Sequence, residues 1–186
     1  MVALVTFVMA ATVVPKPSYA STWQLSDGFE PGLTGNWSCW NSVQDPAFVN
    51  GCNVGYTDQF AHGGTHASWI QGNSGWSDVG RPLSLSAFTA GRTLNCSARI
   101  WGRPLTFNTQ LHGQLEVLDL DTWTYVAVQP FTLTATNDYL KWRPITTSNW
   151  VPPSKYVFVR IGLIGEENNE LDALEVDDLS VSCQYS

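Results

Sequence analysis

A chain of 186 residues, of which 44% are hydrophobic, can bury a substantial core, and its length favours one domain over two. Only 13% of the residues are charged, whereas Gly and Trp number 15 and 9, so the composition favours strands and turns over long helices. The net charge of −7, with no cluster of Lys and Arg, excludes nucleic acid and anionic membranes as expected partners.

The N-terminal segment predicts a cleaved secretory signal peptide. An apolar run from Val2 to Val14 is followed by Ser18, Tyr19 and Ala20, which satisfy the small-x-small rule for a cleavage site. The alternative is a membrane anchor, but the run is shorter than the roughly 20 residues that span a bilayer. We therefore predict a signal peptide over residues 1–20, one mature domain over residues 21–186, secretion, and no membrane insertion after cleavage.

Short apolar alternations recur along the mature chain between Gly, Pro, Asn and Asp residues, and no long helical period appears. This pattern predicts an all-β, antiparallel β-sandwich. The strongest strand covers residues 156–164, where every second residue is aliphatic and should face the core. In chain order, strands are predicted over residues 22–25, 66–71, 78–85, 94–103, 113–119, 124–133, 140–146, 156–164 and 173–183.

All four cysteines lie in the mature part, and an even number in an exported chain predicts disulfides. Of the three possible pairings we favour Cys39 with Cys52, which closes a short loop. The other bond is then Cys96 with Cys183, which ties a central strand to the last one. No Cys-x-x-Cys spacing occurs, which argues against a zinc site.

Several strands turn aromatic and cationic side chains away from the core. Along residues 94–103, Ala98 and Ile100 belong to the inner face. Arg99, Trp101 and Arg103 therefore face outward, as a platform for a ligand or, alternatively, under a covering loop. Flat aromatic rings stack on sugar rings, and planar hydrogen-bonding groups engage hydroxyls. If the strands share one sheet, the predicted carbohydrate-binding surface comprises Arg99, Trp101, Arg103, Gln114, Glu116, Tyr156, Phe158 and Arg160.

Three short motifs occur in order along the mature chain. They are Asp27-Gly28-Phe29-Glu30 with the following Trp37, then Ala61-His62-Gly63-Gly64-Thr65-His66-Ala67, and finally Leu174-Glu175-Val176-Asp177-Asp178-Leu179-Ser180-Val181. Together they resemble the jelly-roll carbohydrate-binding modules of the cellulose- and xylan-binding, galactose-binding-like superfamily. The resemblance implies a jelly-roll sandwich that binds a polysaccharide or oligosaccharide without catalysis.

The resemblance also implies a structural Ca²⁺ site. Its ligands would be the side chains of Glu30 and Asp177, with backbone carbonyls near Gly63 and Thr65 completing the shell. Carboxylate and carbonyl oxygens suit calcium, and paired first and last strands would bring the two acids together. The alternative is that Asp177 and its neighbour Asp178 cap a turn, with Glu30 an ordinary surface residue.

Catalysis has little support in the sequence. Glu116, Asp119 and Asp121 superficially match the carboxylate strand of β-sandwich hydrolases, but a period of two puts Glu116 on the opposite face. We therefore expect a monomeric binding protein and no enzyme. One alternative is a secreted protein-interaction or envelope-associated sandwich, which would use a long loop predicted over residues 37–60 with Trp40 and Tyr56. The other is a polysaccharide hydrolase or lyase.

Overall fold

The computed structural model describes residues 22–32, 34–41, 51–72, 75–89, 93–105, 110–165 and 172–185. The predicted signal peptide lies outside these described residues. Within them, no helix is long and apolar enough to cross a membrane.

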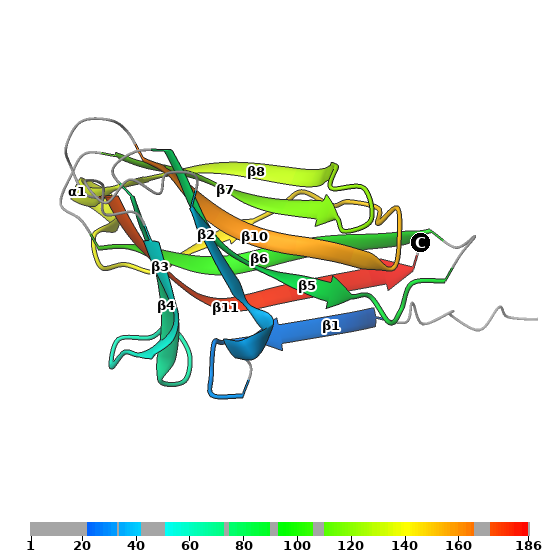
Figure 1. Cartoon of the computed structure of the whole chain (residues 1–186), viewed down its shortest axis with the longest axis horizontal. Helices are drawn as coiled ribbons and strands as arrows, with labels where there is room; N and C mark the ends of the chain where they lie inside the picture. The colour runs from blue at the N-terminus through cyan, green and yellow to red at the C-terminus, as the bar shows by residue number, and fades with distance from the viewer. Residues whose placement is uncertain are drawn as a thin grey trace, which may run out of the picture.

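The described chain forms eleven strands and two short helical turns, packed as two layers (Figure 1). The strands are β1 (Thr22–Asp27), β2 (Ser38–Asn41), β3 (Gly51–Thr57), β4 (His66–Gly72), β5 (Gly75–Ser84), β6 (Leu94–Pro104), β7 (Gln110–Asp119), β8 (Tyr125–Thr134), β9 (Arg143–Thr146), β10 (Tyr156–Gly165) and β11 (Asp172–Tyr185). The helical turns are η1 (Thr34–Asn36) and α1 (Ala135–Asp138).

Two antiparallel sheets make up the sandwich. Sheet A has the order β3-β4-β11-β6-β9, and β1 also pairs with β11. The long strand β11 pairs with β4 through its first part and with β1 through its second. Sheet B has the order β2-β5-β10-β7-β8. The predicted all-β antiparallel sandwich is therefore confirmed.

The core lies between the two sheets, and the residues that alternation predicted to face inward on β10 and β6 belong to it. On β10, Val157, Val159 and Ile161 are at most 1% exposed, and on β6 the same holds for Ala98 and Ile100. Burying one such aliphatic side chain contributes about 1.5–3 kcal/mol, so this inner layer dominates the stability of the sandwich.

Both predicted disulfides are present. Cys96 and Cys183 are directly opposite each other on β6 and β11 within sheet A, and both are buried. Cys39 and Cys52 join β2 of sheet B to β3 of sheet A, with their Cα atoms 5.9 Å apart. This second bond therefore fastens the two sheets at one edge.

The predicted long loop over residues 37–60 is wrong, because the segment contains β2 and β3. Both strands are short, and β3 is interrupted by a bulge between Asn53 and Tyr56, where Gly55 adopts a positive φ of 66°. Neither has the alternation of a half-buried strand, since β2 and β3 lie at the edges of their sheets. The intervening residues 42–50 lie outside the described part.

Candidate functional site

The outer face of sheet B is built by the residues that alternate with the core positions. On β10 these include Phe158, Arg160 and Gly162. The register places Glu116 of β7 opposite Arg160 and Gln114 opposite Gly162. Polar side chains predicted from two separate strands therefore meet on one surface.

Aromatic side chains from other elements border these polar groups. Trp40 is 52% exposed, Trp123 59% and Tyr125 60%. Two contiguous hollows lie among them, with volumes of about 310 and 370 Å³, and share Trp40 and Arg160. We call the combined surface the sheet B groove. It is lined by Ser38, Cys39, Trp40, Trp76, Asp78, Gln114, Glu116, Trp123, Tyr125, Phe158, Arg160 and Ile164.

Two glycines allow aromatic rings to lie close to the sheet. A Cβ atom at Gly162 would overlap the indole of Trp76, and one at Gly80 would overlap the ring of Phe158. Each ring therefore occupies space directly above the backbone of a neighbouring strand. These two positions explain why glycine interrupts otherwise well-formed strands.

The charges in the groove are paired. Arg160 donates from Nε to Oε2 of Glu116 at 2.5 Å and from Nη1 to Oδ2 of Asp78 at 3.3 Å. Trp76 Nε1 donates to the same Asp78 oxygen at 2.6 Å, and its ring centroid is 5.4 Å from the Arg160 guanidinium carbon. Burial raises the pKa of Asp78, and the positive charge of Arg160 opposes that rise. The floor of the groove is thus polar and pre-ordered.

A strained turn presents Trp123 at the rim. Trp123 has a φ of 56°, which is uncommon for a bulky residue, and its N–H donates to the carbonyl of Asp119 at 2.8 Å. The Asp119 carboxylate accepts hydrogen bonds from Thr122 Oγ1 at 2.7 Å and Ser154 Oγ at 2.8 Å, and these bonds lower its pKa. Strain of this kind is concentrated at functional sites, and here it aims an indole ring to within 5.6 Å of the Phe158 ring.

The eight predicted binding residues fall on two faces. Gln114, Glu116, Phe158 and Arg160 line the sheet B groove, and Tyr156 is 45% exposed on the same strand as Arg160. Arg99, Trp101 and Arg103 lie on β6, which belongs to sheet A. The expectation that all of them share a sheet is wrong, because β6 pairs with β11 and β9 whereas β7 pairs with β10.

A covering segment, the alternative considered for Trp101, is present over part of β6. The His62 ring stacks on Trp101 with centroids 4.0 Å apart, and Trp142 meets His62 edge-on. Arg103 is only 6% exposed and forms ion pairs with Glu175 and with Asp58. Burial, with the adjacent Asp58, raises the pKa of Glu175 to about 7. Arg103 therefore belongs to an internal ion network.

Sequence reasoning missed Trp123 and Tyr125 and considered Trp40 only as part of a loop that would bind a protein. Trp40 lies on the unpredicted strand β2, and Trp123 lies in the turn between β7 and β8. A signal was present for Trp123, since a tryptophan between Thr122 and Thr124 in a polar turn has no core to enter. Trp76 and Asp78 were also not predicted as site residues; they lie on β5, where they alternate with the inward-facing Ser77 and Val79.

The predicted calcium ligands lie around one turn. Glu30 Oε1 accepts the N–H groups of Thr65 at 2.7 Å and His66 at 3.0 Å. Asp177, which is fully buried, accepts the N–H of Gly63 at 3.0 Å. Its burial raises its pKa to about 6. The two acids thus approach the same turn from opposite ends of the chain, although no three His, Cys, Asp or Glu side chains of the described residues gather as a metal cage.

Comparison with known proteins defines the class of fold. No protein-family model matches the sequence, and no curated protein is significantly similar to it. The structure is similar to the CBM22-1 xylan-binding domain of Paenibacillus barcinonensis Xyn10C, with a TM-score of 0.52 and 12% identity over 87% of this chain and 92% of that chain.

A second similar structure is the C-terminal family 22 carbohydrate-binding module of Clostridium thermocellum Xyn10B, with a TM-score of 0.55 and 14% identity over 84% of this chain and 91% of that one. The CBM22-1 and GH10 modules of Clostridium thermocellum Xyn10B, complexed with xylohexaose, give a TM-score of 0.56 and 12% identity over 87% of this chain and 28% of that one. The chain therefore has the jelly-roll sandwich fold of these carbohydrate-binding modules, as the three motifs predicted.

Proposed function

We propose that the sheet B groove binds a neutral polysaccharide, and that the protein is a secreted, non-catalytic carbohydrate-binding module. The observation that carries this proposal is the set of three aromatic rings, Trp40, Trp123 and Tyr125, each more than half exposed beside a polar floor. Exposed aromatic clusters of this kind mark binding sites, and flat rings match the apolar faces of pyranoses.

The charges of the groove favour a neutral ligand. Arg160 is already engaged by Asp78 and Glu116, so the described lining residues offer no unpaired cation to an acidic sugar. The paired groups hold fixed orientations, and Gln114 adds an amide that both donates and accepts. Hydroxyl groups of a sugar chain are suited to such a floor, because they can donate to a carboxylate and accept from a guanidinium.

The solved structures suggest the first ligand to test. Two of the similar structures are named as xylan-binding or were determined with xylohexaose, so insoluble xylan is the first polysaccharide to try. Secretion is supported by the two disulfides, which persist in oxidising compartments.

The test is retention of the purified protein on insoluble xylan, compared between the wild type and two variants, Trp40→Ala and Trp123→Ala. Each ring should contribute on the order of 2 kcal/mol as an exposed anchor, so each variant should bind about thirtyfold more weakly. Phe60→Ala is the matched control, because Phe60 is 61% exposed but follows β3 of sheet A.

Retention of both tryptophan variants at the wild-type level would place any ligand outside the groove. If the wild type itself does not bind xylan, the same assay on other insoluble neutral polysaccharides, such as β-glucans, decides whether the groove recognises a polysaccharide at all. Release of reducing sugar during incubation would contradict the non-catalytic assignment.

We propose, in addition, a structural calcium ion at the turn between Glu30 and Asp177. The support is chemical: both carboxylates adjoin the turn at Gly63 to Thr65, and Asp177 is buried with backbone N–H partners from Gly63 and Asp178. Because two carboxylates supply few of the six to eight oxygens that calcium takes, carbonyl oxygens near Gly63 and Thr65 would have to complete the shell.

Calcium that binds only the folded protein raises its melting temperature by mass action. After exhaustive chelation, CaCl₂ added at about a hundred times its dissociation constant should therefore raise the free energy of unfolding of the wild type by about 2.7 kcal/mol. Glu30→Gln should lose this increment, whereas Asp138→Asn, at a carboxylate remote in sequence from the turn, should keep it. A wild-type melting curve that calcium does not move would remove the ion from the proposal and leave the groove unaffected.

A further inference from the structure

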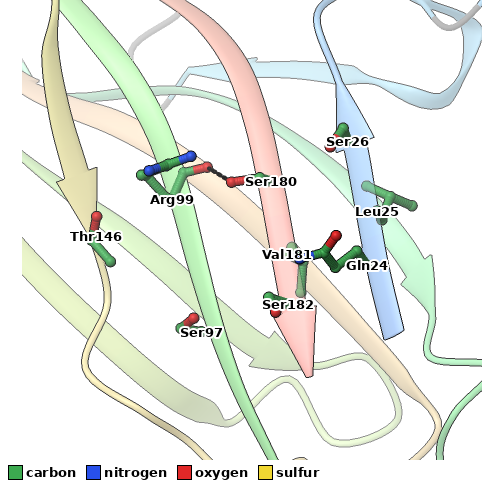
Figure 2. A pocket seen from close by; sticks show the side chains of 9 residues that line it. All are labelled: Gln24, Leu25, Ser26, Ser97, Arg99, Thr146, Ser180, Val181 and Ser182. Atoms are coloured by element: carbon green, nitrogen blue, oxygen red, sulfur yellow. Dashed lines mark hydrogen bonds between the residues drawn. The ribbon is translucent and has the colours of Figure 1, made fainter. Parts of the chain in front are cut away.

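The outer face of sheet A carries a second hollow, separate from the groove. It has a volume of about 450 Å³ and lies across β1, β11, β6 and β9 (Figure 2). The lining residues are Gln24, Leu25, Ser26, Ser97, Arg99, Thr146, Ser180, Val181 and Ser182. Apart from two aliphatic residues, every lining side chain is a hydrogen-bonding group. We call this surface the sheet A hollow.

Strand register explains how the hollow arises. Ser180 and Arg99 are paired between β11 and β6, and so are Ser182 and Ser97. Ser26 lies opposite Ser180 on the other side of β11, and Thr146 lies opposite Arg99 on β9. Short serine side chains thus occupy the middle of the face, which leaves a depression flanked by longer ones. Figure 2 shows Ser97, Ser180 and Ser182 on the two central strands, with a dashed line from Ser180 to Arg99. The Ser180 hydroxyl donates to the Arg99 carbonyl at 3.5 Å.

Arg99 differs from the other arginines that the structure describes. Arg81, Arg103, Arg143 and Arg160 each form an ion pair with a carboxylate. Within the same described ranges Arg99 forms none, and it is exposed to solvent. Its guanidinium carbon lies 5.8 Å from the centroid of the Trp101 ring. In a chain of net charge −7, this is a cation available to an anionic ligand.

The lining chemistry defines the ligand class. A guanidinium offers planar, paired N–H donors that match a carboxylate, and serine hydroxyls both donate to and accept from sugar hydroxyls. No carboxylate side chain lines the hollow to repel an anion. Its volume is in the range of small-molecule sites. We propose that the sheet A hollow is a second binding site, selective for a sugar unit that carries a carboxylate, that is, a hexuronate.

This site differs in kind from the sheet B groove. The groove has exposed aromatic rings and paired charges, whereas the hollow has hydroxyls and an unpaired cation and contains no aromatic side chain among its lining residues. Binding in the hollow should therefore be weak, dependent on charge, and reduced by salt, because exposed charges are screened. Its test is independent of whether the groove binds a neutral polysaccharide.

The experiment is a titration of the ¹⁵N-labelled full mature protein with sodium glucuronate, followed by amide chemical shifts. The expected result is a saturable shift at Ser97, Ser180 and Ser182, with no saturation by methyl glucoside at the same concentrations. Arg99→Gln should weaken binding at least about tenfold, since a hydrogen bond to a charged group contributes more than a neutral one. Because Arg99 is exposed, the variant should keep the wild-type spectrum elsewhere.

The matched control is Arg143→Gln, which removes the same charge from the same sheet at an exposed side chain that does not line the hollow. It should bind glucuronate as the wild type does, and so should Trp40→Ala in the groove. Equal weakening by both arginine variants would show a general effect of net charge and overturn the site. Equal binding of acetate would show recognition of a bare carboxylate and overturn the sugar assignment, and saturation by methyl glucoside or no saturation at all would overturn the proposal.

Discussion

The two disulfides make it possible to separate the stability of the sandwich from the function of the groove. We consider a Cys39→Ala/Cys52→Ala variant beside a Cys96→Ala/Cys183→Ala variant. The first bond closes a loop of 13 residues and the second a loop of 87. In the chain-entropy description, these loops correspond to losses of about 3 and about 5 kcal/mol. The second variant also empties space in the core, which adds on the order of 1 kcal/mol.

The two variants should rank in the opposite order when binding, and not stability, is measured. Cys39 lines the groove beside Trp40, and β2, which carries both, is only four residues long and pairs with β5. Opening the Cys39–Cys52 bond frees this edge strand from sheet A, so the position of Trp40 becomes less defined. Cys96 and Cys183 are buried between β6 and β11 and do not line the groove. The less destabilised variant should therefore be the weaker binder.

Urea unfolding measures the stability difference, and retention on insoluble xylan measures binding at a temperature where both variants are folded. A larger loss of stability in the Cys39→Ala/Cys52→Ala variant would refute the loop-length reasoning. Wild-type retention by that variant would show that β2 holds Trp40 without the disulfide.

Three further predictions concern single positions. Gly162→Ala should lower the free energy of unfolding by about 1–3 kcal/mol and weaken binding, because the new Cβ overlaps the Trp76 indole. Gly35→Ala, with open space around the new Cβ, should have neither effect. Urea unfolding measures the stability, and retention on insoluble xylan measures the binding. Burial raises the pKa of Glu175 from its ordinary 4.5 to about 7, so the folded protein holds this proton more tightly than the unfolded chain does. The contribution of Glu175 to the free energy of unfolding should therefore fall as the pH rises from 4.5 to about 7. Glu175→Gln should abolish this pH dependence, which urea unfolding at a series of pH values measures. Hydrogen bonds from the backbone N–H of Thr134 and from Arg143 lower the pKa of Asp138. The contribution of Asp138 to the free energy of unfolding should therefore be present above its ordinary pKa and disappear as the pH falls below it. An Asp138→Asn variant that loses stability at acidic pH to the same extent as the wild type would contradict this.

The sequence was informative wherever a strand has one buried face. On β10 and β6 the alternation of apolar residues identified the inner face correctly, because period two follows directly from strand geometry. The disulfides were also accessible, since Cys96 and Cys183 lie on the inner alternation of predicted strands. The alternation is a local pattern, and it can be read without knowing which strand is the neighbour.

Membership of a sheet is a different kind of information. Strand β6 pairs with β11, whose partner residues lie far away along the chain; Cys96 and Cys183, for example, are 87 positions apart. Nothing in the alternation of β6 distinguishes this partner from β10. The outward residues Trp101 and Phe158 look alike in sequence, yet one lies under His62 and the other in an open groove. The two residues were wrongly grouped on one face because the long-range pairing of their strands cannot be read from local sequence patterns.

The two tryptophans at the rim of the groove come from parts of the chain where local rules are weakest. Trp40 sits on a four-residue edge strand, and Trp123 has a positive φ in a tight turn. Outward side chains in the middle of a central strand stand on the surface of the sheet, whereas edge strands and turns place rings at its rim. Trp40 and Trp123 are absent from the core, most of whose buried residues come from the longer strands. Substitutions at Trp40 and Trp123 should therefore change binding with little change in the free energy of unfolding, so a loss of retention in these variants reports on the site itself.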